Sequence, residues 1–127
     1  MIKAYLATIP TYYEGEDIQV RYSIIQDQSI LKKEYINLDY VKPAVTGLIG
    51  MITLVNKLQE YKLEEIEIII YDAALYELVN GTSTTKKGEI LKIASKARRM
   101  IKTLKNLRIT DVSKDHSLIS DWDMKLK

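Results

Sequence analysis

A single aspartate stands at the end of the most apolar stretch of the sequence. Residues 66–71 are Ile-Glu-Ile-Ile-Ile-Tyr, and Asp72 follows them directly, ahead of a short helical pattern. α/β enzymes bind ligands beyond the carboxyl ends of their strands, and carboxylate oxygen is the donor that Mg²⁺ and Mn²⁺ prefer. Asp72 is therefore the first candidate metal ligand. A structural alternative stays open, because an aspartate before a helix often caps it by accepting from backbone N–H groups.

A second chemical feature is a concentration of positive charge. Residues 1–82 carry seven Lys/Arg against twelve Asp/Glu, whereas residues 83–108 carry nine against one. On a helix, most of these cations would form a ridge opposite the apolar stripe, which suits contact with phosphates. They are Lys92, Lys96, Arg98, Arg99, Lys102 and Lys105. The ridge predicts sequence-independent nucleic-acid binding that weakens with salt. A solvated helix face, balanced by the acidic first half, is the alternative.

Length and composition bound the class of protein. The 127 residues suffice for one domain, residues 1–127, and the 46% hydrophobic and 28% charged content is ordinary for a globular protein. With no cysteine, disulfides and thiolate metal sites are excluded. The first residues are too polar for a signal peptide, and no membrane-spanning stretch follows. A cytoplasmic protein that does not engage membranes is the expectation.

The elements that must position these groups begin with three strands. Alternating apolar residues predict strands over 2–9, 18–25 and 30–38. The short turns between them indicate an antiparallel meander. Residues 66–71 form an almost continuous apolar run, which predicts a central strand buried on both faces. Residues 107–112 predict a fifth strand.

Helical patterns connect the later strands. Pro43 suits a first helical turn, and apolar residues at helical spacing carry that helix to about residue 61. Residues 73–79 predict a short helix that stops at Asn80-Gly81, and residues 86–105 a long one. Residues 117–126 indicate a closing helix. The order βββ-α-β-α-α-β is typical of an α/β protein, or α+β, with a five-stranded mixed sheet flanked by helices.

That order and the stretch IIIYDAALYELVNG resemble the ribonuclease H family, in which an apolar strand ends in Asp-Ser and leads into a short helix ending in Asn-Gly. Alanine replaces the serine here. The basic helical region and the closing segment KARRMIKTLKNLRITDVSKDHSLISDWD are also similar to the family. The resemblance covers nearly the whole chain. It implies a ribonuclease H-like fold and, as ligands, Mg²⁺ or Mn²⁺ and RNA or an RNA–DNA hybrid.

The resemblance also places candidate site residues. His116 falls near the family's mobile histidine, and Asp121 or Asp123 near its last carboxylate. With Asp72, these are the catalytic candidates, and the three aspartates are also the candidate metal ligands. The family's first-strand acid is absent, because Leu6-Ala7-Thr8-Ile9 stands there, and Thr46 or Gly47 stands where a helical Glu is expected. Two close Mg²⁺ ions need several carboxylates to offset their mutual repulsion, so two missing acids predict a degenerate site.

These features predict a ribonuclease H-like protein that binds nucleic acid without efficient cleavage. A divergent, active metal-dependent nuclease with replacement ligands is the first alternative. A small interaction or regulatory protein that uses the fold as a scaffold is the second. For this second alternative, the small size and the Lys/Ile-rich composition of the chain would suit a phage or mobile-element protein.

Overall fold

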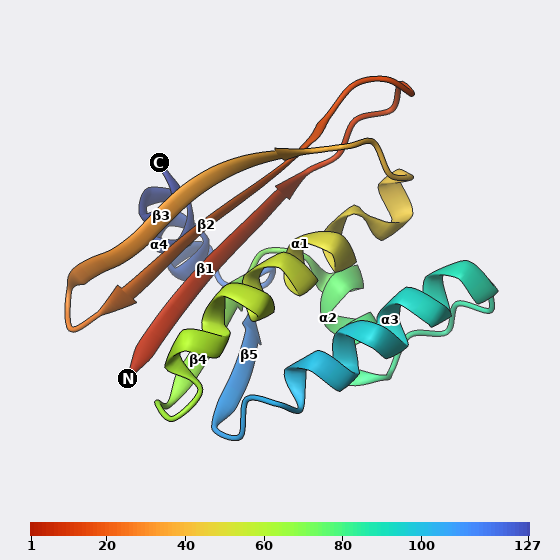
Figure 1. Cartoon of the computed structure of the whole chain (residues 1–127). Helices are drawn as coiled ribbons and strands as arrows, with labels where there is room; N and C mark the ends of the chain where they lie inside the picture. The colour runs from red at the N-terminus through yellow and green to blue at the C-terminus, as the bar shows by residue number, and fades with distance from the viewer.

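The structure is a computed structural model that describes residues 1–127, with five strands, four α-helices and one short 3₁₀ helix (Figure 1). The strands are β1 (Ile2–Ile9), β2 (Ile18–Gln26), β3 (Ser29–Leu38), β4 (Ile66–Ile70) and β5 (Leu107–Asp111). The helices are α1 (Pro43–Leu58), η1 (Gln59–Tyr61), α2 (Ala73–Asn80), α3 (Gly88–Ile101) and α4 (His116–Leu126).

The strands form one mixed sheet in the order β3-β2-β1-β4-β5. β1 pairs antiparallel with β2, and β2 with β3, whereas β4 lies parallel to both β1 and β5. The meander and the helix-connected strands therefore share a sheet, and the predicted five-stranded mixed sheet is confirmed. In the β1–β4 register Leu6 lies beside Ile70, which brings the end of β1 close to Asp72.

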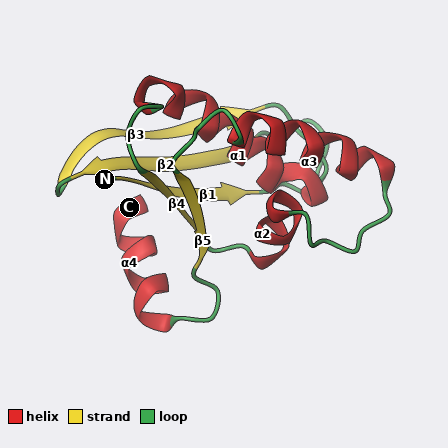
Figure 2. Ribbon diagram, turned by 90° about the horizontal axis from the view of Figure 1, so that it is seen from below, coloured by secondary structure: helices red, strands yellow, loops and turns green.

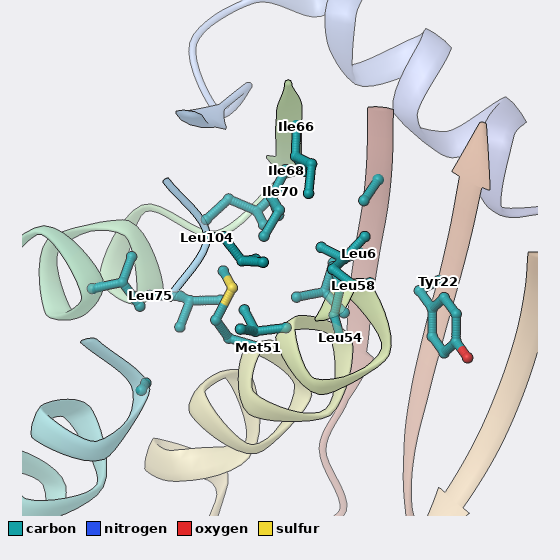
Figure 3. Packing of buried hydrophobic residues seen from close by; sticks show 14 of the residues in the cluster. Leu6, Tyr22, Met51, Leu54, Leu58, Ile66, Ile68, Ile70, Leu75 and Leu104 are labelled. Atoms are coloured by element: carbon teal, nitrogen blue, oxygen red, sulfur yellow. The ribbon is translucent and has the colours of Figure 1, made fainter. Parts of the chain in front are cut away.

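Helices cover the two faces of the sheet unequally, as Figure 2 shows. α1, α2 and α3 lie on one side with the larger hydrophobic cluster of 20 buried residues, and α4 lies alone on the other with a cluster of five. Figure 3 shows the larger cluster, where Met51 and Leu54 of α1 face Leu6 and the isoleucines of β4. None of the helices combines the length and the apolar character that a bilayer crossing needs.

The apolar run of β4 follows from its central position. All five residues of β4 are buried. Ile66, Ile68 and Ile70 enter the larger cluster, and Ile69 enters the smaller one on the α4 side. A strand that is covered on both faces cannot alternate apolar with polar residues. β4 is therefore a rigid support for the residue that follows it, Asp72.

Two helices are shorter than the sequence predicts. The first predicted helix divides into α1 and the 3₁₀ turn η1. α3 ends at Ile101, whereas the pattern predicts a helix to residue 105. The Thr103 hydroxyl donates to Met100 O at 2.6 Å and accepts from Gln59 Nε2 at 2.9 Å. A side-chain hydrogen bond to nearby backbone competes with continuation of the helix. The second bond, from Gln59, joins Thr103 to a residue that is distant in the sequence.

Candidate functional site

The carboxyl ends of β1, β3, β4 and β5 meet at one edge of the sheet, here called the C-terminal edge, because these strands run in the same direction. α1, α2 and α4 follow β3, β4 and β5, so each of these helices begins at this edge. A contact of 3.3 Å between Lys42 Nζ and Glu89 Oε2 joins the starts of α1 and α3 there. This is where α/β folds place ligands, and Asp72 lies on it.

Asp72 acts as the N-cap of α2. Its backbone is extended, with φ −166° and ψ 93°, and its Oδ1 accepts from Leu75 N at 3.0 Å. This is the geometry in which an aspartate satisfies a helix N-terminal N–H that otherwise has no partner. Asp72 therefore caps α2, as the structural alternative predicted. Its second carboxylate oxygen, Oδ2, accepts no hydrogen bond.

Asp111 is a neighbour of Asp72 that the sequence argument missed. Its Oδ1 accepts from Asp72 N at 3.1 Å, and from Ser113 N and Oγ at 3.3 and 2.7 Å. Asp111 ends β5 as Asp72 follows β4, and the two strands are parallel neighbours. Asp111 could have been predicted as a neighbour of Asp72 from its position, because adjacent parallel strands end side by side. The Asp111 carboxylate serves to fix the two strand ends to each other.

α1 presents glycine to Asp72. A Cβ at Gly47 would lie 3.1 Å from Asp72 Oδ2, so position 47 of α1 faces this carboxylate. The neighbouring Thr46 is buried, and its hydroxyl donates to Lys42 O at 3.3 Å. Thr46 and Gly47 are the two positions where an acid was expected by resemblance. Neither offers an oxygen donor toward Asp72.

The end of β1 likewise brings packing groups rather than acids. The Thr8 methyl fills the space over Gly50, where a Cβ would overlap it. Ala7 packs on the small cluster under α4. Both residues line a cavity of about 70 Å³ beside Asp72, together with Leu6, Ile70, Tyr71, Leu75 and Trp122. The walls of this cavity are mainly apolar.

Trp122 is the α4 residue that reaches the C-terminal edge. Its Nε1 donates to Leu6 O at 2.9 Å, and its ring meets Tyr71 edge-on at 5.4 Å between centroids. The indole thus closes one side of the cavity beside Asp72. A tryptophan so placed anchors α4 to β1 and contributes apolar surface, with its one donor satisfied.

Asp121, one residue earlier, faces another part of the sheet. Its carboxylate accepts from Lys125 Nζ at 2.6 Å and from the Tyr5 hydroxyl at 3.2 Å. The hydrogen bond from Lys125 outweighs the effect of burial and lowers the pKa of Asp121. Burial, followed by the charge of Asp121, raises the pKa of Tyr5 to about 12. Asp121 is therefore bound into a pair with Lys125 and is not brought together with Asp72.

The two other candidates from the closing segment are exposed. Asp123 Oδ2 pairs with Lys127 Nζ at 3.0 Å on the outer side of α4. His116 is the first residue of α4, directly after the N-cap Asp115, and is exposed. Of the four residues predicted for catalysis, the structure leaves Asp72 alone at the mouth of the apolar cavity.

The donor set does not fit a two-metal centre. No group of three or more His, Cys, Asp or Glu side chains lies close enough to hold a metal ion. Two adjacent Mg²⁺ ions need several carboxylates. At the C-terminal edge, one carboxylate oxygen of Asp72 and one of Asp111 already accept hydrogen bonds from backbone N–H groups.

The basic residues fall into two groups. Lys92, Lys96 and Arg99 are exposed along α3, and Lys102 and Lys105 are exposed just beyond its end. None of these five has a carboxylate within ion-pair distance, since the five salt bridges of the chain involve other cations. Arg98 differs, because its Nη1 donates to Leu78 O at 2.7 Å and ties α3 to α2.

Solved structures with the same fold are ribonuclease H proteins. A ribonuclease H1 from the halophilic archaeon Halobacterium salinarum superposes with a TM-score of 0.78 at 14% identity, covering 89% of this chain and 86% of that one. LC11-RNase H1, isolated from compost by a metagenomic approach, gives 0.79 at 13% identity, covering 98% and 91%.

A further structure shows LC11-RNase H1 in complex with an RNA/DNA hybrid. It superposes with a TM-score of 0.75 at 13% identity and covers 91% of this chain and 87% of that one. No family model and no curated protein matches the chain. At these identities the likeness establishes the ribonuclease H fold, and function has to be argued from the residues present.

Proposed function

We propose that this protein binds nucleic acid through α3 and does so without metal-dependent cleavage. The observation that carries the proposal is the row of exposed cations on and after α3 that have no acidic partner within the chain. Unpaired cations on one helix face attract polyanions and release counterions when phosphates bind. The RNA/DNA hybrid held by a protein of the same fold supports nucleic acid as the ligand class.

The absence of cleavage is argued from the C-terminal edge. Gly47 and Thr8 offer no carboxylate, and Asp72 already caps α2. Trp122 and the Thr8 methyl occupy space around Asp72 with apolar groups. A site that held two Mg²⁺ or Mn²⁺ ions would need ligands in those places. The degenerate-site hypothesis is therefore preferred to the divergent nuclease.

Binding is tested by fluorescence anisotropy across a salt series. A variant with Lys92→Ala, Lys96→Ala and Arg99→Ala should bind more weakly at low salt. Each lost phosphate contact should reduce the slope of log affinity against log salt by about one. The matched control removes three cations elsewhere that also have no ion pair, with Lys33→Ala, Lys62→Ala and Lys114→Ala, and should retain the wild-type slope. If the wild type binds no nucleic acid at low salt, the proposal is wrong, and the scaffold alternative remains.

Cleavage is tested separately. A labelled RNA–DNA hybrid is incubated with a molar excess of protein and either Mg²⁺ or Mn²⁺, and we expect the hybrid to stay intact. Strand scission that Asp72→Asn abolishes would show an active nuclease instead. Scission that survives Asp72→Asn would indicate a contaminant, and a second purification would remove it.

A further inference from the structure

α3 stands at the margin of the molecule. It packs principally on α1 and α2 rather than on the strands, and it lies at the side of the helical layer in both views (Figures 1 and 2). Its two buried residues are the small Ala94 and Ala97. Small residues let its inner side approach the neighbouring helices closely, and the outer half of its circumference stays open to solvent.

The open half of α3 carries a straight row of cations. Lys92, Lys96 and Arg99 follow one another at intervals of four and three residues, so they lie on one face over about 10 Å of helix. α3 contains no aromatic residue. Proteins that hold single strands rely on aromatic side chains for base stacking. The face is therefore suited to a duplex backbone or groove rather than to unstacked bases.

Further cations flank this row at both ends of the helix. Lys86 and Lys87 are exposed immediately before α3, and Lys102 and Lys105 are exposed after it. Where a helix enters a groove, its ends approach the phosphate backbones that border the groove. Cations at both ends and along the outer face thus match the charge of a groove-bound helix better than that of a helix touching one strand.

We propose that α3 docks into the major groove of B-form double-stranded DNA; this inference rests on the nucleic-acid binding proposed above. The B-form major groove is about 12 Å wide and 8.5 Å deep and admits one α-helix, whose diameter with side chains is about 10–12 Å. The major groove of A-form duplexes is deep and narrow and excludes side chains. RNA duplexes and RNA–DNA hybrids, which adopt A-form geometry, should therefore be poorer ligands.

Arg98 differs from the cations of the row, because it is tied to α2. Its guanidinium reaches the Leu78 carbonyl near the end of α2 at 2.7 Å. Ala94 and Ala97 are buried in the core, so the opposite side of α3, with Lys92, Lys96 and Arg99, points outward. The Arg98 side chain is held by α2 and is therefore not part of the row.

The experiment compares four labelled ligands of one sequence and about 20 nucleotides per strand: a DNA duplex, an RNA duplex, an RNA–DNA hybrid and single-stranded DNA. Affinities are measured at one low salt concentration. We expect the DNA duplex to bind roughly tenfold more tightly than either A-form duplex. Equal or tighter binding of the hybrid, the RNA duplex or the single strand would overturn the inference and leave nucleic-acid binding in place. Failure of all four to bind would overturn both.

A competition experiment addresses the groove directly. Methyl green occupies the major groove and netropsin the minor groove, so methyl green should displace the protein from the DNA duplex and netropsin should not. The reverse pattern would contradict the inference. Lys96→Ala should weaken binding of the DNA duplex more than Lys33→Ala, a charge-matched change on β3, and equal effects would also count against docking of α3.

Discussion

The backbone of Gly47 lies against the carboxylate of Asp72, so closely that a Cβ at position 47 would be 3.1 Å from Asp72 Oδ2. α1 therefore approaches the end of β4 at a point where it carries no side chain. Asp72 receives no partner from α1 and keeps its other oxygen on Leu75 N. This one contact links the absence of a helical acid to the capping role of Asp72.

Asp72→Ala should lower the free energy of unfolding by about 1 kcal/mol, because the first turn of α2 loses its side-chain cap. Asp72→Asn should cost only a few tenths, since asparagine caps nearly as well. Urea unfolding followed by circular dichroism measures both. If Asn proves as harmful as Ala, the cap does not account for the role of Asp72.

Gly47→Glu should create divalent-ion affinity. The new side chain would start 3.1 Å from Asp72 Oδ2, and Asp111 accepts from Asp72 N, so three acids would stand at the C-terminal edge. Without metal the variant should melt below the wild type, because two carboxylates are held close together. Mn²⁺ should raise the melting temperature of Gly47→Glu. The melting temperature of Gly47→Gln should not change when Mn²⁺ is added. An equal response of the Glu and Gln variants would show that position 47 cannot complete a metal site.

The order and direction of the elements could be predicted because each strand and helix carries its own periodicity. The run that becomes β4 and the Asp72 that follows it are local signals. The end of α3 could not be placed, because it depends on Gln59 meeting Thr103 across 44 positions. Contacts of that kind are set by packing and leave no mark on the pattern within the helix.

The site was harder to predict than the fold, since it depends on which side of α4 faces the sheet. Asp121 and Trp122 are adjacent, yet one pairs with Tyr5 and Lys125 while the other reaches Leu6 and Tyr71. A rotation of α4 by one residue, about 100°, would bring Asp121 to the position that Trp122 holds. Sequence similarity to a family cannot fix that rotation when the matching residues are so few.

Acid should weaken the protein partly through Glu67. Burial disfavours its charged form, but hydrogen bonds from Thr110 and Arg108 prevail, so the pKa of Glu67 is lowered from its ordinary value of 4.5. A lowered folded-state pKa stabilises the protein above about pH 4.5, and this contribution is lost as the pH falls through the folded-state value. At neutral pH, Glu67→Gln should therefore have a lower free energy of unfolding than the wild type. This difference in free energy should become smaller as the pH falls.

The control for this prediction is Glu64→Gln, which changes an exposed acid that has no ion pair. Its stability relative to the wild type is measured over the same pH range, as the reference for an acid-to-amide change without buried hydrogen bonds. Chemical unfolding at each pH provides the free energies. A constant gap for Glu67→Gln as well would mean that its hydrogen bonds do not favour the charged form.

Alkaline pH should act through Tyr5. Its pKa is raised to about 12, by burial and then by Asp121, so the folded chain holds this proton more tightly than the unfolded chain does. The resulting stabilisation is complete below the ordinary value of 10 and disappears as the pH rises toward 12. Tyr5→Phe should lose less stability than the wild type over that interval. Parallel losses in the two proteins would contradict the assignment.

Trp122 offers a direct optical reading of α4, because it is the one tryptophan of the chain. Trp122→Ala should cost about 3 kcal/mol by removing the indole and leaving the Leu6 carbonyl without its donor. Trp122→Phe should cost less. In the wild type, indole fluorescence and circular dichroism should report one unfolding midpoint. An earlier fluorescence midpoint would show that α4 detaches before the sheet unfolds.

The Thr8 methyl over Gly50 makes the two positions mutually dependent. Any side chain at position 50 collides with Thr8, so a larger residue there is tolerable only after position 8 has become smaller. Substitutions at one position therefore change which substitutions the other accepts, which is epistasis in the evolutionary sense. A variant with an acid at position 8, which is also larger than alanine, would have to keep glycine at 50. Related sequences with a side chain at position 50 should accordingly carry a residue smaller than threonine at position 8.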